Sequence, residues 1–211
     1  MDVNVINELQ NGLSAAYING SMAANLAYKP AFVSNNPEEG KKVISSVEDE
    51  LLRCEEFQIS VAFITMGGVT PLLQTLKELE KKGVKGQILT TNYLNFSEPR
   101  ALEKLNSLKN VEAAGNGFHT KGYIFKKEEI YRIIIGSSNM TSAALTVNKE
   151  WNTKLISTEN GEVAEEIVEE FQRLWNSEYA LPYDDFYEVY KERYNIIKHQ
   201  REIAKSEEIP S

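Results

Sequence analysis

Apolar and polar positions along the first half of the chain predict strands and helices that alternate. Apolar runs of strand length lie at residues 57–65, 84–94 and 111–115, and the first of them is nearly continuous, as in a strand buried on both faces. Between them, residues 66–83 and 96–108 carry apolar side chains every three or four residues, which is the spacing of an amphipathic helix. This order predicts βαβ units and a sheet with parallel strands.

The second half of the chain has a different pattern, with three strands in succession. We expect strands at residues 118–125, 131–139 and 150–157, and because no helix separates them, part of the sheet should be antiparallel or mixed. A strongly amphipathic helix is then predicted at residues 162–176. The predicted fold class is α/β, with one mixed sheet flanked by helices.

The chain is expected to divide into one folded domain and two appended segments. Residues 1–28 predict a helical start, residues 29–178 the folded domain, and residues 179–211 a charged helical tail or linker. Gly83 and Ser97 are expected to cap the helices beside them. Tyrosines recur in the tail every three or four residues, which we interpret as packing positions: Tyr179, Tyr183, Tyr187, Tyr190 and Tyr194.

The composition favours a cytoplasmic location. The 211 residues include one cysteine, Cys54, so no disulfide can form within the chain, and a lone thiol is typical of a reducing compartment. Acidic neighbours disfavour a reactive thiolate at this position. No apolar run approaches the roughly 20 residues that span a membrane, and the first residues lack the features of a secretory signal. We therefore expect no membrane partner.

The charge distribution identifies one basic segment. The net charge is −8, which by itself disfavours a nucleic-acid partner. Residues 1–99 carry a net charge of −4, residues 100–154 a net charge of +4, and residues 155–211 a net charge of −8. An anionic substrate is therefore compatible with residues 100–154.

Polar side chains interrupt the predicted strands of this basic segment. His119 and Lys121 share one face of the stretch FHTKGYIF, because alternate residues of a strand point the same way. The next strand ends in a glycine, where backbone can approach a ligand closely, and in polar residues, and the strand after it begins with a carboxylate. The residues concerned are Gly136, Ser137, Ser138, Asn139 and Glu150.

These groups suit the hydrolysis of a phosphodiester. Ammonium, amide and hydroxyl donors can neutralise its anionic oxygens, and a neutral imidazole at His119 can attack phosphorus to give a phosphohistidine. A carboxylate, for which Glu150 is the candidate, can fix the tautomer of the imidazole. The leaving oxygen also needs a general acid, and His199, the only other histidine, lies in the charged tail and suits this role poorly.

Two further observations complete the list of candidate residues. Thr90 and Thr91 close a predicted strand at its carboxyl end, where α/β folds place ligand contacts, so we expect them to lie near the substrate. Two distant histidines and one cysteine offer no ligand cluster, so neither a metal nor another cofactor is expected.

Each feature also has a structural interpretation when it is taken alone. His119 could be a structural histidine, Lys121 a lysine that extends its ammonium to solvent at a sheet edge, and Glu150 a surface carboxylate. The stretch GSSN is an ordinary turn sequence at the end of a strand. Their occurrence in this order, with matching strand faces, favours a catalytic site.

The combination of His119 and Lys121 with GSSN at residues 136–139 and Glu150 resembles the signature of the phospholipase D superfamily. The resemblance implies metal-independent chemistry in which two such histidines act as nucleophile and general acid, while lysine, asparagine and serine hold the phosphate. Members of the superfamily often carry two copies of the signature, whereas this chain carries one. The resemblance therefore implies a homodimer with the active site at its interface.

Residues 29–176 further resemble the phospholipase D-like module at the amino terminus of certain bacterial helicase-containing proteins, and metal-independent restriction endonucleases. This resemblance implies DNA, or else RNA, as partner and a covalently linked helicase beyond the tail. The fuller signature has an aspartate five residues after the lysine, where this chain has Lys126. That departure disfavours phospholipase activity.

The sequence thus predicts a DNA endonuclease that acts through a phosphohistidine in a homodimer. A first alternative is a non-catalytic nucleic-acid-binding or dimerisation module of a helicase. A second is a hydrolase of phospholipids or small phosphodiesters, although the sequence offers no apolar groove or membrane-binding helix for a lipid.

Overall fold

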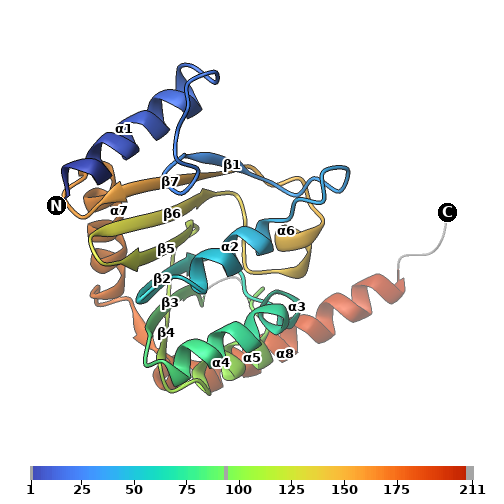
Figure 1. The fold of residues 1–211 in the computed structure, drawn as a ribbon. Helices are drawn as coiled ribbons and strands as arrows, with labels where there is room; N and C mark the ends of the chain where they lie inside the picture. The colour runs from blue at the N-terminus through green and yellow to red at the C-terminus, as the bar shows by residue number, and fades with distance from the viewer. Residues whose placement is uncertain (1, 93–94, 208–211) are drawn as a thin grey trace.

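The structure is a computed structural model that describes residues 2–92 and 95–207. Within these residues, one eight-stranded sheet has the strand order β1-β7-β6-β5-β2-β3-β4-β8 (Figure 1). The strands are β1 (Ala31–Val33), β2 (Glu56–Val61), β3 (Lys85–Thr91), β4 (Val111–Asn116), β5 (Lys121–Lys127), β6 (Ile130–Gly136), β7 (Asn152–Thr158) and β8 (Leu181–Pro182).

The pairing of the strands confirms the predicted mixed sheet. Strands β2, β3 and β4 are parallel, and helices connect them. The remaining neighbours, β2 with β5, β5 with β6, β6 with β7, β7 with β1 and β4 with β8, are all antiparallel. The tight turn between β5 and β6 allows antiparallel pairing directly, whereas parallel neighbours require a crossover helix.

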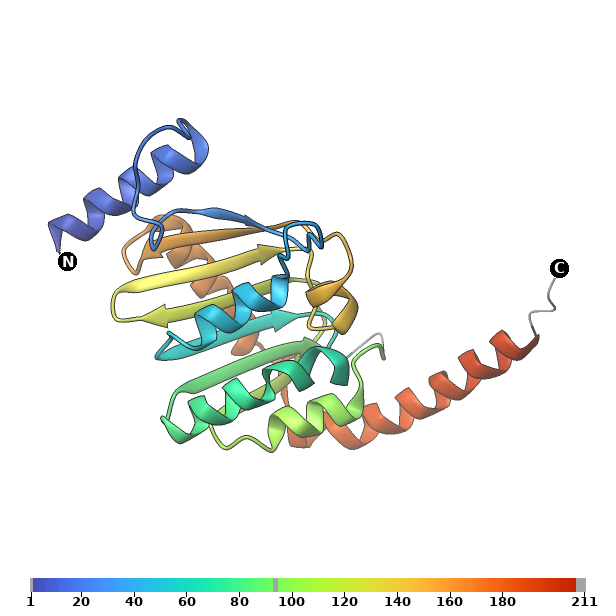
Figure 2. The same ribbon diagram turned by 45° about the vertical axis from the view of Figure 1, so that its right-hand side comes forward.

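Helices cover both faces of the sheet (Figure 2). They are α1 (Val3–Tyr17), α2 (Val43–Leu51), α3 (Met66–Val69), the 3-10 turn η1 (Thr70–Leu72), α4 (Leu73–Lys81), α5 (Pro99–Asn106), α6 (Ser142–Thr146), α7 (Glu162–Trp175) and α8 (Tyr183–Glu207). The main core packs α2, α4 and α5 against one face of the sheet. A smaller cluster packs Phe171 of α7 against Leu89, Ile124 and Ile133 on the other face.

Two predicted helix boundaries illustrate local sequence effects. Gly83 has a φ of +72°, and the N–H of Val84 donates to the Leu79 carbonyl, so the expected glycine cap at the end of α4 is confirmed. Ser97 does not cap α5, whose N-cap is Glu98. Its hydroxyl instead accepts a hydrogen bond from the Ile64 N–H at 3.0 Å.

The strands that carry the candidate site are shorter at this end than predicted. β5 begins at Lys121, so His119 precedes the strand instead of lying within it. β6 ends at Gly136, and the three residues after it, Ser137 to Asn139, leave the strand. The alternation of strand faces therefore does not extend to the residues on which the site prediction depends.

The two ends of the chain differ from the expected segments. α1 ends at Tyr17, and three of the apolar residues that recur along it at helical spacing are exposed, namely Ile6, Leu13 and Tyr17. The expected boundary at residues 178 and 179 does not separate a tail from the core. β8 pairs with β4, and the first half of α8 buries side chains in the main core: Tyr183, Phe186, Tyr187 and Tyr190.

Candidate active site

The polar residues predicted from the sequence gather at one end of the sheet. The register is the cause, because Gly122 of β5 pairs with Ile135 of β6, and Gly136 of β6 pairs with Asn152 of β7. The start of β5, the end of β6 and the start of β7 therefore coincide. The residues that flank these strand ends are His119, Lys121, Ser137, Asn139 and Glu150.

His119 is exposed, and its imidazole contacts the ammonium of Lys121. The Lys121 Nζ lies 2.7 Å from Nδ1 and 3.4 Å from Nε2 of the ring, and 3.0 Å from the His119 carbonyl oxygen. An ammonium carries only donors, so the contact at Nδ1 requires a lone pair on that nitrogen. In the single chain, the contact with Lys121 thus orients the imidazole.

Ser137 and Glu150 form a second pair between the ends of β6 and β7. The Ser137 hydroxyl donates to Glu150 Oε2 and accepts a hydrogen bond from the Trp151 N–H at 3.0 Å. We expected the Glu150 carboxylate to orient His119. In the described part of the single chain its hydrogen-bond donor is Ser137, and no bond joins it to His119.

Glu150 nevertheless acts on the charge of the site. Burial lowers the pKa of Lys121 from its ordinary value, and the nearby Glu150 carboxylate opposes part of this change. The partly buried ammonium contacts the imidazole and senses the charge of the Glu150 carboxylate, and it can attract an anionic oxygen.

Asn139 connects the end of β6 to the residues that follow β2. Its Oδ1 accepts a hydrogen bond from the Phe63 N–H at 3.1 Å, and the Met140 N–H donates to the Phe63 carbonyl at 3.1 Å. These bonds hold the partly buried Asn139 beside the site with its Oδ1 occupied. The amide Nδ2 is a donor that neither bond uses.

Ser138 points away from the site, into the core. Its side chain is fully buried, and its Oγ accepts a hydrogen bond from Asn152 Nδ2 at 2.9 Å, while its N–H donates to Asn152 Oδ1 at 3.2 Å. Asn152 also donates to the Val33 carbonyl. The Ser138 hydroxyl is therefore not available to a substrate in this structure. Asn152 was not predicted, although a buried asparagine at a strand start indicates such a network.

Gly136 is required for the close approach of two strands. A Cβ atom at this position would lie 2.2 Å from the Trp151 carbonyl oxygen and 2.6 Å from the Asn152 Cα atom. We expected the glycine to admit a ligand, whereas the backbone that approaches it belongs to β7. Gly136 thus positions Ser137 and Glu150 by bringing β6 and β7 together.

Thr90 and Thr91 at the end of β3 are both buried, with 1% of each side chain exposed. The Thr90 hydroxyl lies 3.3 Å from the Ala62 carbonyl oxygen and 3.2 Å from Ser97 Oγ. The structure therefore places Thr90 and Thr91 in the interior behind the site, and it does not bring them to the surface where His119 lies.

An aromatic residue that we did not predict contacts His119, and a second one contacts the first. The Phe63 ring meets the imidazole edge to face, with centroids 5.7 Å apart, and it meets the Phe96 ring at 4.9 Å. Phe96 is 45% exposed. The sequence signal was weak, because Phe63 lies in an apolar run and Phe96 at the start of a predicted helix.

The sequence profile described as "Cardiolipin synthase, PLD-like domain" matches residues 49–175, which contain all of these site residues. The chain belongs to this phospholipase-D-like family. No curated protein sequence matches the chain.

Three solved structures resemble the fold. NucT from Helicobacter pylori has a TM-score of 0.59 and 17% identity, over 73% of this chain and 98% of that one. Nuc from Salmonella typhimurium, a phospholipase D family member, has a TM-score of 0.56 and 21% identity, over 74% and 99%. Phosphatidylserine synthase from Haemophilus influenzae has a TM-score of 0.58 and 13% identity, over 84% and 46%.

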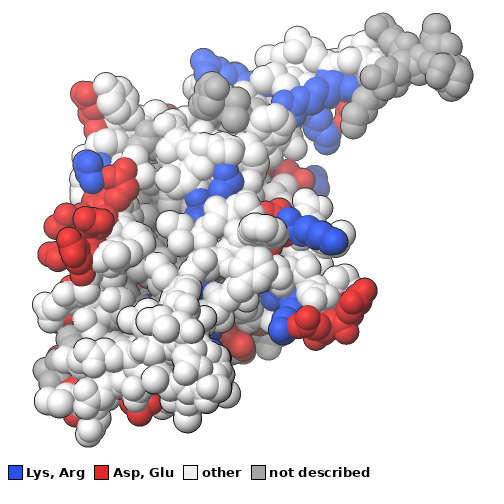
Figure 3. Space-filling model, turned by 90° about the horizontal axis from the view of Figure 1, so that it is seen from above, with Lys and Arg blue, Asp and Glu red and all other residues white. Residues whose placement is uncertain are grey.

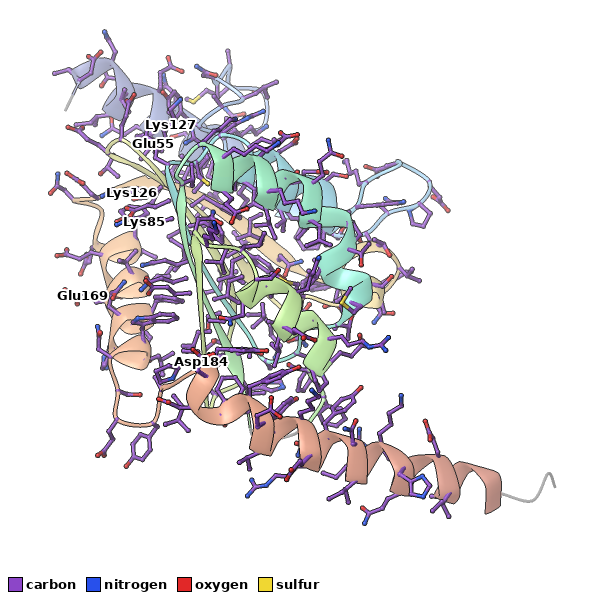
Figure 4. All side chains as sticks on the ribbon, turned by 90° about the horizontal axis from the view of Figure 1, so that it is seen from below. Glu55, Lys85, Lys126, Lys127, Glu169 and Asp184 are labelled. Carbon is purple, nitrogen blue, oxygen red and sulfur yellow. The ribbon has the colours of Figure 1, made fainter. Side chains whose placement is uncertain are left out.

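The departure from the phospholipase-D-like signature lies far along β5 from His119. Lys126 is near the other end of the strand, where Figure 4 draws it close to Lys127 and Glu55. Its ammonium is 3.6 Å from Glu56 and 3.7 Å from Glu159. The substitution thus affects surface ion pairs away from the histidine end of the phospholipase-D-like domain.

Two further findings concern the described part of this phospholipase-D-like chain. Among those residues, no group of three or more His, Cys, Asp or Glu side chains is arranged to hold a metal ion. No described helix is both long enough and apolar enough to cross a membrane.

Proposed function

We propose that the chain is a metal-independent phosphodiesterase that cleaves DNA, with His119 as its nucleophile. The observation that carries the proposal is the pairing of an exposed imidazole with the Lys121 ammonium, beside Ser137, Asn139 and Glu150, in a phospholipase-D-like domain. Nucleophilic catalysis needs an accessible imidazole, and the anionic phosphate needs donors fixed in advance.

The proposed reaction has two steps. A phosphate oxygen draws the Lys121 ammonium away from Nδ1. The proton of the neutral imidazole then resides on Nδ1, so that Nε2 has a free lone pair and attacks phosphorus. The P–N bond forms as the bond to the leaving oxygen breaks, and that oxygen takes a proton from a general acid. Water then attacks phosphorus and returns a proton to the deprotonated general acid, while the P–N bond breaks and His119 is released as a neutral imidazole. Asn139 Nδ2 assists Lys121 in holding the phosphate, while Ser137 keeps Glu150 beside the lysine.

A homodimer supplies the general acid in this proposal. His199, the other histidine, is exposed on α8, and the second catalytic imidazole is therefore His119 of the partner subunit. An exposed aromatic pair adjoins Glu150: the Phe32 and Trp151 rings have centroids 5.9 Å apart and are 62% and 74% exposed. Such a patch beside an incomplete site supports an interface with a second copy.

DNA is the favoured substrate because the site lies in the basic segment, residues 100–154, and phosphate contacts dominate the binding of nucleic acids. We also propose that the domain works in the cytoplasm as part of a longer, helicase-containing protein. The competing proposals are a module that binds nucleic acid without cleaving it, and a hydrolase of phospholipids or small phosphodiesters.

Assays in excess EDTA test this function. The purified chain is incubated with supercoiled plasmid, single-stranded DNA, single-stranded RNA and phospholipid vesicles, and we expect cleavage of DNA without added metal. Turnover of lipid alone would replace the proposal with the lipid hydrolase. Binding of DNA without cleavage, by a chain that sediments as a dimer, would replace it with the non-catalytic module.

The pH dependence of phosphate binding is a second expected result. Only the protonated form of Lys121 attracts an anion, and burial lowers its pKa, so affinity should fall as the pH rises through a value below the ordinary lysine pKa of about 10.4. In Lys121→Arg the charge persists, and the alkaline decline should disappear. Inhibition by inorganic phosphate measures this. The control is Lys127→Arg, an exposed lysine at the far end of β5, which should leave the profile unchanged.

A further inference from the structure

The helix α8 changes character half-way along its length while keeping the same face toward the domain. Its first half packs tyrosines and a phenylalanine into the main core. The same face then continues at spacings of three and four residues, but its side chains become basic or polar. These residues are Lys191, Tyr194, Lys198 and Arg201. We call them the α8 basic face.

The α8 basic face extends beyond the sheet. Figure 1 shows the second half of α8 leaving the domain as an arm, and in Figure 3 blue side chains lie along this arm. Residues 189–205 contain five lysines and arginines against two glutamates, although residues 155–211 as a whole carry a net charge of −8. The basic residues of α8 thus all follow the buried Tyr190.

A chain of ring contacts connects this face to His119. The Arg201 guanidinium lies over the Phe96 ring, 4.6 Å from its centroid. The Phe96 ring contacts Phe63, and Phe63 contacts the imidazole of His119. A cationic residue on α8 is therefore separated from the candidate nucleophile by two aromatic rings.

The loop that carries Phe96 is fixed by α8 itself. The buried Tyr190 hydroxyl donates to the Ser97 carbonyl at 2.8 Å, and the Glu98 N–H donates to the Ile64 carbonyl at 2.7 Å. Phe96 is therefore an exposed ring on an anchored backbone, which is what a stacking surface requires.

A groove of about 710 Å³ runs between α8 and the start of α5. Its lining includes Lys191, Lys198 and Arg100, together with Glu98 and Glu103. Glu98 is engaged, because its Oε2 accepts a hydrogen bond from the Met66 N–H at 2.7 Å. Lys198 has the Glu202 carboxylate at 4.0 Å on an exposed surface, where such a pair contributes little. The groove lining thus has three basic side chains against two carboxylates, an excess of one positive charge that favours a polyanion.

We propose that the α8 basic face and Phe96 bind single-stranded nucleic acid and guide it to His119. Lysine and arginine neutralise the phosphates along the groove, while an unpaired base stacks on Phe96, replacing Arg201 or lying against the ring beside it. Bases within a duplex are stacked on their neighbours and have no free face for such a contact. We therefore expect single strands to be preferred. The delivery of the bound strand to His119 rests on the proposed function, whereas the binding itself does not.

Binding is measured separately from cleavage to test this inference. Fluorescence anisotropy follows a labelled oligothymidylate in EDTA, on the His119→Ala chain, so that no turnover occurs. Phe96→Leu should weaken binding by about 5- to 100-fold. Lys198→Gln and Arg201→Gln should each weaken binding and reduce the slope of log affinity against log salt by about one. A duplex of the same length should bind less tightly.

The matched control is Arg193→Gln, which removes the same charge from an exposed residue of α8 outside the α8 basic face. It should leave both affinity and salt slope nearly unchanged. An effect equal to that of Arg201→Gln would overturn the proposal, since binding would then follow net charge alone. Loss of dimer on sedimentation of Phe96→Leu would assign the face to a second copy instead. Retained binding without cleavage by the unmutated chain would remove the proposed function and leave this inference intact.

Discussion

Replacement of His119 by alanine is expected to lower the rate of DNA cleavage in EDTA by about 10⁴-fold or more. In the proposed homodimer this single change removes both the nucleophile and the general acid, and groups that act as a unit are lost together. His119 is exposed and precedes β5, so the fold should persist. The effect is measured as the ratio of initial cleavage rates of the wild type and His119→Ala. Equal melting temperatures of the two proteins show that the variant is folded. A loss of less than about tenfold would exclude the imidazole as nucleophile.

Mixed dimers separate this mechanism from one with a complete site in each chain. When wild type and His119→Ala exchange subunits in equal amounts, about a quarter of the dimers contain two histidines, and the rate should fall to that fraction. A rate of about one half would mean that each chain works alone. The control is His199→Ala, which should be fully active. An inactive His199→Ala would move the general acid to α8.

The sheet was predictable because its causes are local. Alternating helices and strands require the parallel order of β2, β3 and β4, and the closely spaced strands after β4 require antiparallel pairing. The same pairing places the start of β5 and the start of β7 at one end of the sheet, where Lys121 contacts His119 and senses the charge of Glu150.

The details of the site were less predictable, because they depend on residues outside the strands. Alternation of faces stops where a strand stops, so it could not show that Ser138 turns into the core toward Asn152. Nor could it show that Ser137 takes the Glu150 carboxylate expected at His119. These choices are made by hydrogen-bond satisfaction among groups distant in sequence.

The contact between α8 and Phe96 illustrates a different limit. The sequence of the tail is acidic on average, which conceals the basic residues that follow its buried tyrosines. Residues at this helical spacing pack into the core only as far as the helix lies against the domain. In α8 that extent depends on β4, because β8 pairs with β4 and the start of α8 contacts it. The net charge of the whole segment therefore does not reveal that α8 has a buried aromatic first half and a basic second half.

Replacement of Glu50 by alanine is expected to reduce the free energy of unfolding by about 3–5 kcal/mol. Glu50 is 2% exposed, and its two carboxylate oxygens lie 3.5 Å from Arg132 Nε and 3.2 Å from Lys154 Nζ. The variant leaves two partly buried cations without their shared anion, on the two strands, β6 and β7, whose ends carry Ser137 and Glu150. Urea unfolding measures the loss, which corresponds to a decrease of about 6–20 °C in melting temperature.

Two further variants separate the effect of the unpaired cations from the effect of lost side-chain packing. Asp49→Ala alters an exposed carboxylate on the same helix and should change stability by less than about 0.5 kcal/mol. The triple variant Glu50→Leu, Arg132→Met and Lys154→Met removes every charge of the cluster and should recover most of the stability, because a buried ion cluster contributes little beyond an apolar one of equal volume. Failure of the triple variant to recover would mean that the cluster holds α2 against β6 and β7 by its hydrogen-bond geometry. Its charges would then be needed for the strand alignment on which the site depends.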